Sequence, residues 1–176
     1  EHSYLKSAYT ILYRVEPTEK FYPYIKWMAT RDRPFEDIEY ALFGLAGFKK
    51  PADIAFIDSI LLANTGWMTN LSFRIMREYP NSQYMNVLAK YAKKGFYSNI
   101  CMGHSTYEVG PFFQALASYK NEKSAEILKA ILTRKPFLPC PADSEYVQDL
   151  LFDAIWDNPC DAYADLIRKI MLEVTK

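Results

Sequence analysis

A repeated local pattern constrains this chain more than any other feature of its sequence. An aromatic residue is followed by a short polar turn, and an apolar pair returns eight and nine residues later. The pattern occurs at Tyr13 with Phe21 and Tyr22, Phe48 with Phe56 and Ile57, Tyr79 with Val87 and Leu88, and Tyr119 with Ile127 and Leu128. Successive aromatic anchors are 35, 31 and 40 residues apart, which is the length of two helices with their turns.

A looser fifth copy begins at Trp156, whose apolar pair arrives two residues later than in the other copies. Asn81, Asn121 and Asn158 stand in the polar turns, where their side chains can accept hydrogen bonds from the free N–H groups of a new helix. Pro51 and Pro159 suit the first position of a helix. We therefore predict an all-α fold, a short α-α superhelix (solenoid) of about five antiparallel helix hairpins, forming one domain over residues 1–176.

With this spacing and turn placement, the chain resembles the HEAT-like family of helical repeats. The resemblance implies stacked helix pairs and the binding of a partner along the concave surface formed by the second helices. The chain departs from the family in lacking the regular Asp and Arg positions that link neighbouring repeats. Tetratricopeptide-like or other α-α packing therefore stays open.

Composition excludes a few classes of protein. Half of the residues are hydrophobic and 24% are charged, which is typical of a folded soluble domain, and no apolar run is long enough for a membrane span. Cys101, Cys140 and Cys160 are too few and too scattered for a disulfide framework. The chain begins at Glu1 rather than Met, so we expect a processed or truncated product, and the compartment stays unassigned.

Charge is unevenly distributed, although the net charge is zero. Residues 136–167 hold seven acidic residues and no Lys or Arg, and four of the acids follow one another at intervals of four: Glu145, Asp149, Asp153 and Asp157. On a helix these four residues form one line, named here the acidic ridge. It could be a solvated face or be neutralised by Lys129, Arg134 or Arg168. It could instead dock a basic protein. A divalent-cation site is disfavoured without loop oxygen ligands.

The longest interruption of the repeat runs from Lys94 to Pro111, and we expect a functional loop there. Its chemically interesting residues are Cys101, His104, Tyr107 and Glu108. Cys101 with His104 could in principle provide a nucleophile and its base. However, the chain has no second such pair and none of the common nucleotide-binding or hydrolase motifs, so we predict no catalytic residue, no metal and no cofactor.

We predict a non-enzymatic protein that binds another protein, such as an adaptor or an immunity-type binder, through the acidic ridge and the central loop. The alternative is an enzyme or a nucleic-acid-processing protein with its site near Cys101 and His104. Nucleic acid is disfavoured because the acids of residues 136–167 would repel phosphates, although the middle of the chain is basic. The basic residues are Arg74, Arg77, Lys90, Lys93 and Lys94. Clustered N-terminal aromatics, among them Tyr24 and Trp27, leave self-association possible.

Overall fold

The computed structural model describes residues 11, 12, 15, 16, 18–30, 38–63, 67–94, 106–132 and 141–174. Within these ranges all regular structure is helical, which confirms the all-α prediction for the described part of the chain. The chain divides into two compact units, residues 1–63 and 64–176. Stacked repeats and separate domains can both give such a division, so one domain stays a prediction.

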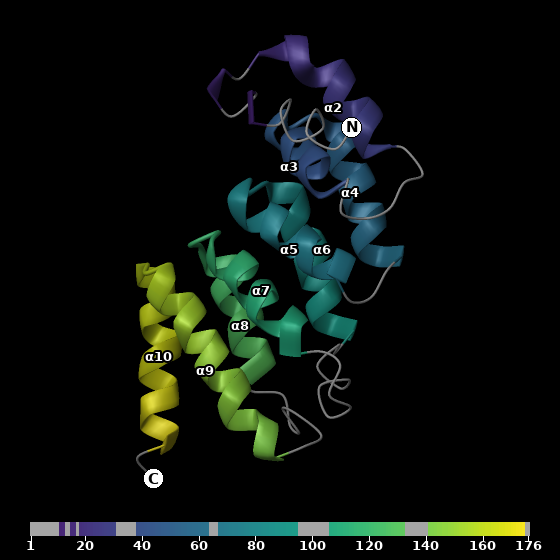
Figure 1. The fold of residues 1–176 in the computed structure, drawn as a ribbon. Helices are drawn as coiled ribbons and strands as arrows, with labels where there is room; N and C mark the ends of the chain where they lie inside the picture. The colour runs from purple at the N-terminus through teal and green to yellow at the C-terminus, as the bar shows by residue number, and fades with distance from the viewer. Residues whose placement is uncertain are drawn as a thin grey trace. The chain divides into compact units, whose positions relative to one another are not determined.

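The described part of the first unit includes a short 3₁₀ helix and the α-helices that follow it (Figure 1). The 3₁₀ helix Glu19–Phe21 leads directly into α2 (Tyr22–Ala29), and α3 (Glu39–Gly47) and α4 (Pro51–Ala63) follow. Helix α3 packs against both α2 and α4, and its buried residues include Leu42 and Leu45. Helix α4 begins at Pro51, as predicted.

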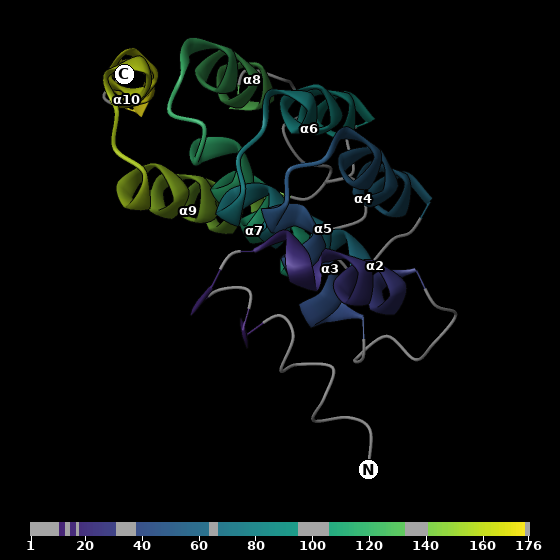
Figure 2. The ribbon, with the colours of Figure 1, turned by 90° about the horizontal axis from the view of Figure 1, so that it is seen from above.

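Over the residues that the structure describes in the second unit, six helices are arranged in two rows (Figures 1 and 2). One row consists of α5 (Trp67–Glu78), α7 (Thr106–Ala117) and α9 (Pro141–Asp157), with α7 packed against both neighbours. The other consists of α6 (Ser82–Lys94), α8 (Glu122–Leu132) and α10 (Asp161–Val174), with α8 in the middle. Within this unit, three helix pairs therefore lie side by side, whereas a superhelix of five hairpins stays a prediction.

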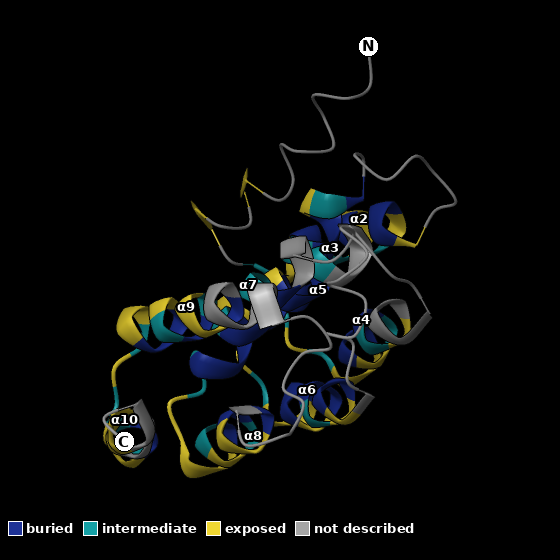
Figure 3. Cartoon of the chain, turned by 90° about the horizontal axis from the view of Figure 1, so that it is seen from below, coloured by how far each residue is buried: buried dark blue, intermediate teal, exposed yellow. Residues whose placement is uncertain are grey.

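Aromatic rings fill the core of the second unit, where α5, α6 and α7 meet. Phe73 stacks edge to face on Tyr91 and on Phe112, with ring centroids 5.1 and 5.2 Å apart. Phe112 and its neighbour Phe113 are fully buried, and Figure 3 shows the buried residues on the inner sides of the helices. Edge-to-face pairs of this kind stabilise a core beyond the area that they bury.

The predicted loop from Lys94 to Pro111 is wrong at its C-terminal end, because α7 begins at Thr106 and contains Pro111. Proline removes one backbone hydrogen bond from the interior of a helix. The buried side chains of Val109 and Phe112 on either side of it offset this loss, because tertiary packing outweighs local propensity. A Cβ at Gly110 would lie 3.5 Å from Leu150 of α9, an ordinary contact.

Two of the three predicted asparagine turns are confirmed as helix starts. The Asn81 side chain accepts from the backbone N–H of Gln83 at 2.9 Å. The Asn121 side chain accepts from the N–H of Ser124, also at 2.9 Å. These bonds satisfy N–H groups in the first turns of α6 and α8.

The third turn differs from the prediction. Helix α10 begins at Asp161, so Pro159 precedes the helix by two residues instead of opening it. The amide of Asn158 donates to the carbonyl of Ala154 at 2.9 Å and so caps the end of α9. It thereby satisfies one of the carbonyls left free at a helix C-terminus.

Tyrosine hydroxyls link neighbouring hairpins where an Asp–Arg ladder is missing. The Tyr119 hydroxyl donates to the Asn81 carbonyl at 3.0 Å and joins the turn of one hairpin to that of the preceding one. The Tyr163 hydroxyl of α10 donates to the Ala117 carbonyl at 2.9 Å and lies 2.8 Å from the hydroxyl of Ser124. Burial raises the pKa of the Tyr163 hydroxyl above its ordinary value of 10.

Candidate functional site

The acidic ridge lies on α9, the longest helix of the second unit. Asp149, Asp153 and Asp157 are exposed, while the apolar residues of the same helix, such as Val147 and Leu151, are buried against the unit. Glu145 belongs to the same helix, but its side chain lies outside the described part. Amphipathic patterning therefore directs the ridge toward solvent.

Of the cations considered as counter-ions for the ridge, Arg168 and Lys129 are described, and neither forms an ion pair with Asp149, Asp153 or Asp157 in the described residues. Arg168 pairs with Asp165 at 2.7 Å, and Lys129 lines a hollow with acids of α8 and α10. Arg134 lies outside the described residues. Over the ranges that the structure describes, no ion pair reaches Asp149 or Asp153. Asp157 accepts a hydrogen bond from the Gln114 side-chain amide at 2.8 Å.

An apolar groove of about 730 Å³ lies between α9 and α10 and is named here the α9–α10 groove. Trp156 forms part of its wall and is 84% exposed, an unusual degree of exposure for tryptophan. The wall residues are Phe152, Asp153, Ile155, Trp156, Pro159, Cys160, Tyr163, Ala164 and Ile167. Asp153 belongs both to the ridge and to this wall, so the charged and apolar surfaces are continuous.

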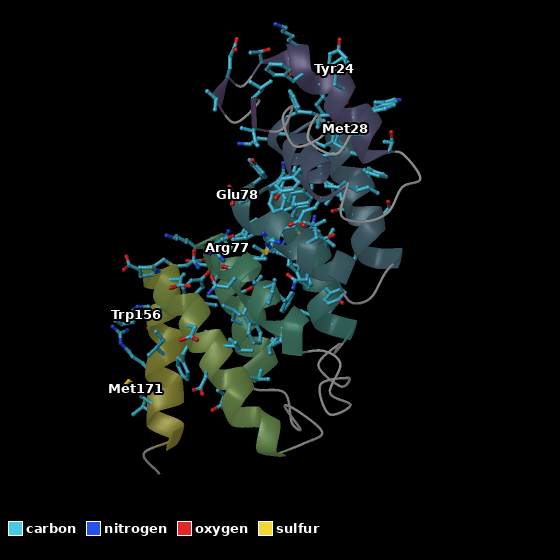
Figure 4. All side chains as sticks on the ribbon, in the orientation of Figure 1. Tyr24, Met28, Arg77, Glu78, Trp156 and Met171 are labelled. Atoms are coloured by element: carbon cyan, nitrogen blue, oxygen red, sulfur yellow. The ribbon has the colours of Figure 1, made fainter. Side chains whose placement is uncertain are left out.

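Apolar surface continues along α10 beyond the groove. Met171 and Leu172 are 62% and 66% exposed. In Figure 4 the labelled side chains of Trp156 and Met171 both lie on the outer side of the α9–α10 pair. Large apolar residues gathered on one exposed surface are typical of a binding site.

Sequence reasoning placed Trp156 only as a repeat anchor and missed the groove. A signal for it exists in α9, where Leu150 to Phe152 and Ala154 to Trp156 are two apolar triplets separated only by Asp153. Three consecutive residues span about 200° of a helix, so such triplets cover more than the stripe that one neighbouring layer can bury. Part of this apolar surface must therefore face outward.

Another hollow, of about 320 Å³, is lined by residues of α5, α7 and α9. Arg74 and Arg77 of α5 line it together with Asp153, so its walls carry opposite charges. Lys90 and Lys93 are exposed on a different helix, α6, while the side chain of Lys94 lies outside the described residues. The basic cluster is thus divided between two helices.

The predicted loop site is only partly described. Cys101 and His104 lie outside the described residues, whereas Tyr107 and Glu108 belong to the first turn of α7 instead of a loop. Their role stays a prediction. In the described ranges, no group of three or more His, Cys, Asp or Glu side chains is arranged to hold a metal. Cys160 is a free, half-buried thiol in the wall of the α9–α10 groove.

The first unit contains a different charged cluster, which joins α2 to α4. Asp53 is 2% exposed and receives hydrogen bonds from Lys26 Nζ at 3.1 Å and from the Tyr22 hydroxyl at 3.3 Å. Lys26 also donates to the Tyr22 oxygen at 2.9 Å. The bonds to Tyr22 and then to Asp53 raise the pKa of Lys26. Lys50 lies 3.5 Å above the Tyr22 ring centroid and pairs with Glu19 at 2.7 Å.

The aromatic residues near the N-terminus divide between core and surface. Phe21 is buried, whereas Tyr24 and Trp27 of α2 are 53% and 52% exposed. Tyr4, Tyr9 and Tyr13 lie outside the described residues. Half-exposed rings of this kind are compatible with self-association, which stays a prediction.

Among the helices that the structure describes, none is both long and apolar enough to cross a membrane. No family model, curated protein or solved structure matches the chain.

Proposed function

We propose that this chain is a non-enzymatic helical-repeat protein, a short α-α solenoid of the HEAT-like kind, that binds another protein through the acidic ridge of α9. The two rows of alternating helices in the second unit support the solenoid. The proposed partner is basic, and an adaptor and an immunity-type binder are both consistent with such a role.

One observation carries the proposal: the exposed carboxylates of α9 stand beside an exposed apolar surface. Like charges four residues apart destabilise a helix by about 0.2–0.5 kcal/mol per pair. In the described residues no ion pair reaches Asp149 or Asp153, although Arg74 and Arg77 line one hollow together with Asp153. A basic partner would remove the repulsion on binding. Protein interfaces commonly combine an apolar centre with a charged rim, and the rim sets orientation and association rate.

Affinity capture from the native organism, followed by mass spectrometry, tests the proposal. The bait is compared with an Asp149→Asn/Asp153→Asn variant. The matched control is Glu122→Gln/Glu126→Gln, which removes two exposed carboxylates that are also four residues apart, on α8. We expect a basic protein that the wild type and the control retain, that the ridge variant loses, and that added salt releases. Equal recovery with all three baits would contradict a role for the ridge.

A further inference from the structure

We propose that the α9–α10 groove receives one amphipathic helix of the basic partner, with large apolar side chains on one face and Lys or Arg along its edges. This inference rests on the proposed function and specifies the chemistry of the partner. It is carried by the length of the apolar strip, by the charges around the groove and by the helical character of both walls.

The apolar strip is long enough for a helix. It runs from Cys160, the residue before α10, through Ala164 and Ile167 to Met171, at the spacing of one helix face. At a rise of 1.5 Å per residue this stretch measures about 16 Å, or about three helical turns. A small ligand in the groove would leave Met171 uncovered, whereas a helix lying along α10 would cover it.

The charges around the groove select a basic occupant. Asp153 is part of the wall, while Asp157 ends α9 and Asp161 begins α10 at the turn that closes the pair. Arg168, the cation nearest in sequence, already pairs with Asp165 at 2.7 Å. A symmetric pairing with a second copy of the chain would bring acidic surfaces together, which disfavours self-association through this face.

The helical walls select a helical occupant. An extended peptide is usually bound by adding a strand to a sheet edge, and the described residues contain no strand. A groove between two helices instead accepts apolar side chains at positions i, i+3 or i+4, and i+7 of a docked helix. Trp156 at the edge of the groove would be the main anchor, because tryptophan is enriched among residues that dominate binding energy.

Fluorescence anisotropy with labelled peptides tests the inference on the full chain. The probe has Leu at i, i+3, i+4 and i+7 and Lys elsewhere. The first reference peptide has the same composition in scrambled order, and the second has Glu in place of Lys. We expect the probe to bind at least about tenfold more tightly than either reference peptide. The scrambled peptide lacks the apolar face that the groove would accept, and the Glu peptide lacks the positive charge that would pair with the acidic residues around the groove. Equal binding of the probe and the scrambled peptide overturns the inference.

Two tryptophan variants locate the site. Trp156→Ala is expected to weaken the probe about tenfold or more, whereas Trp27→Ala, which removes the 52% exposed tryptophan of the first unit, should leave binding unchanged. Trp156 is 84% exposed, so its removal should preserve the fold, and circular dichroism checks this. Probe binding that ignores Trp156→Ala overturns the inference.

Other outcomes separate this inference from the proposed function. If capture of the cellular partner depends on the ridge but not on Trp156, the protein-binding function stands and the groove inference fails. If capture depends on Trp156 but not on the ridge, the ridge function fails. If sedimentation shows a dimer that Trp156→Ala dissociates, a second copy occupies the groove and the basic-helix inference is wrong.

Discussion

Carboxylates occur in two opposite settings in this molecule. Asp53 in α4 is 2% exposed and is bonded to Lys26 and Tyr22, whereas Asp149 and Asp153 in α9 are exposed and have no ion pair in the described ranges. The first arrangement joins two helices of one unit. The second joins nothing that the structure describes and adds repulsion along one helix. The paired carboxylate therefore serves the fold, whereas the role that we propose for the two exposed carboxylates is intermolecular.

The Asp53 cluster also shows how a buried charge is tolerated. Only one of its oxygens is bonded, because Oδ2 is buried without a hydrogen-bond partner in the described part of the structure. Because one oxygen of this buried carboxylate lacks a hydrogen bond, the cluster contributes less to stability than a fully bonded one would. It nevertheless fixes α2 against α4 at a defined point. Breaking the bonds between Asp53 and its partners should therefore lower the free energy of unfolding more than removing charge from the ridge does.

Matched Asp→Asn substitutions in the buried cluster and in the ridge should show the largest difference, measured as the change in the free energy of unfolding. Asp53→Asn removes the charge that Lys26 and Tyr22 bond to, and we expect the free energy of unfolding to fall by about 1–3 kcal/mol. Asp153→Asn, at an exposed position, should not lower it. Chemical denaturation of both variants measures the difference. Similar losses for the two variants would mean that the ridge is as structural as the buried cluster.

Alkaline pH should reduce the difference between wild type and Asp53→Asn. The pKa of Lys26 is raised above its usual 10.5 in the folded chain, so the folded state holds this proton more tightly than the unfolded state does. The resulting stability is fully present below pH 10.5 and is lost as the pH rises through the folded-state pKa. The difference between the unfolding free energies of the pair, measured from about pH 8 to about pH 12, should therefore become smaller, by the part of the Lys26 stabilisation that comes from Asp53 rather than Tyr22.

The control for this pH dependence is the comparison of wild type with Asp153→Asn. Asp153 has no Lys within ion-pair distance in the described ranges, so its small difference from wild type should stay constant over the same pH interval. If the difference in unfolding free energy between wild type and Asp53→Asn also stayed constant with pH, the stabilising effect of Lys26 would not depend on Asp53.

Much of the local architecture follows from the sequence. Spacing and turn chemistry predicted the helices around Asn81 and Asn121 and the start of α4 at Pro51, because capping and proline effects act within a few residues. Two turns carried no such signal. Lys49 and Lys120 adopt φ values of 55° and 50°, a conformation for which glycine is the usual indicator.

The errors have a common physical origin in tertiary packing. Pro111 suggested a break, but the buried Phe112 and Val109 keep α7 helical. The ridge was predictable because charge spacing is visible in one helix. The α9–α10 groove was harder to foresee, because it depends on how two helices meet. A single-helix pattern can show that α9 has surplus apolar surface, but not that Trp156 of α9 and Tyr163 of α10 line the same groove.

The smallest expected effect is the change in stability when two charges are removed from the ridge itself. Asp149→Asn/Asp153→Asn removes like-charge repulsion between residues four apart. The free energy of unfolding should therefore rise slightly, by about 0.2–0.5 kcal/mol, or stay unchanged. Added salt should reduce the gain, because the charges are exposed. Thermal denaturation at low and high salt measures both. A loss above about 1 kcal/mol would indicate structural ion pairs, and the ridge would then serve the fold as Asp53 does.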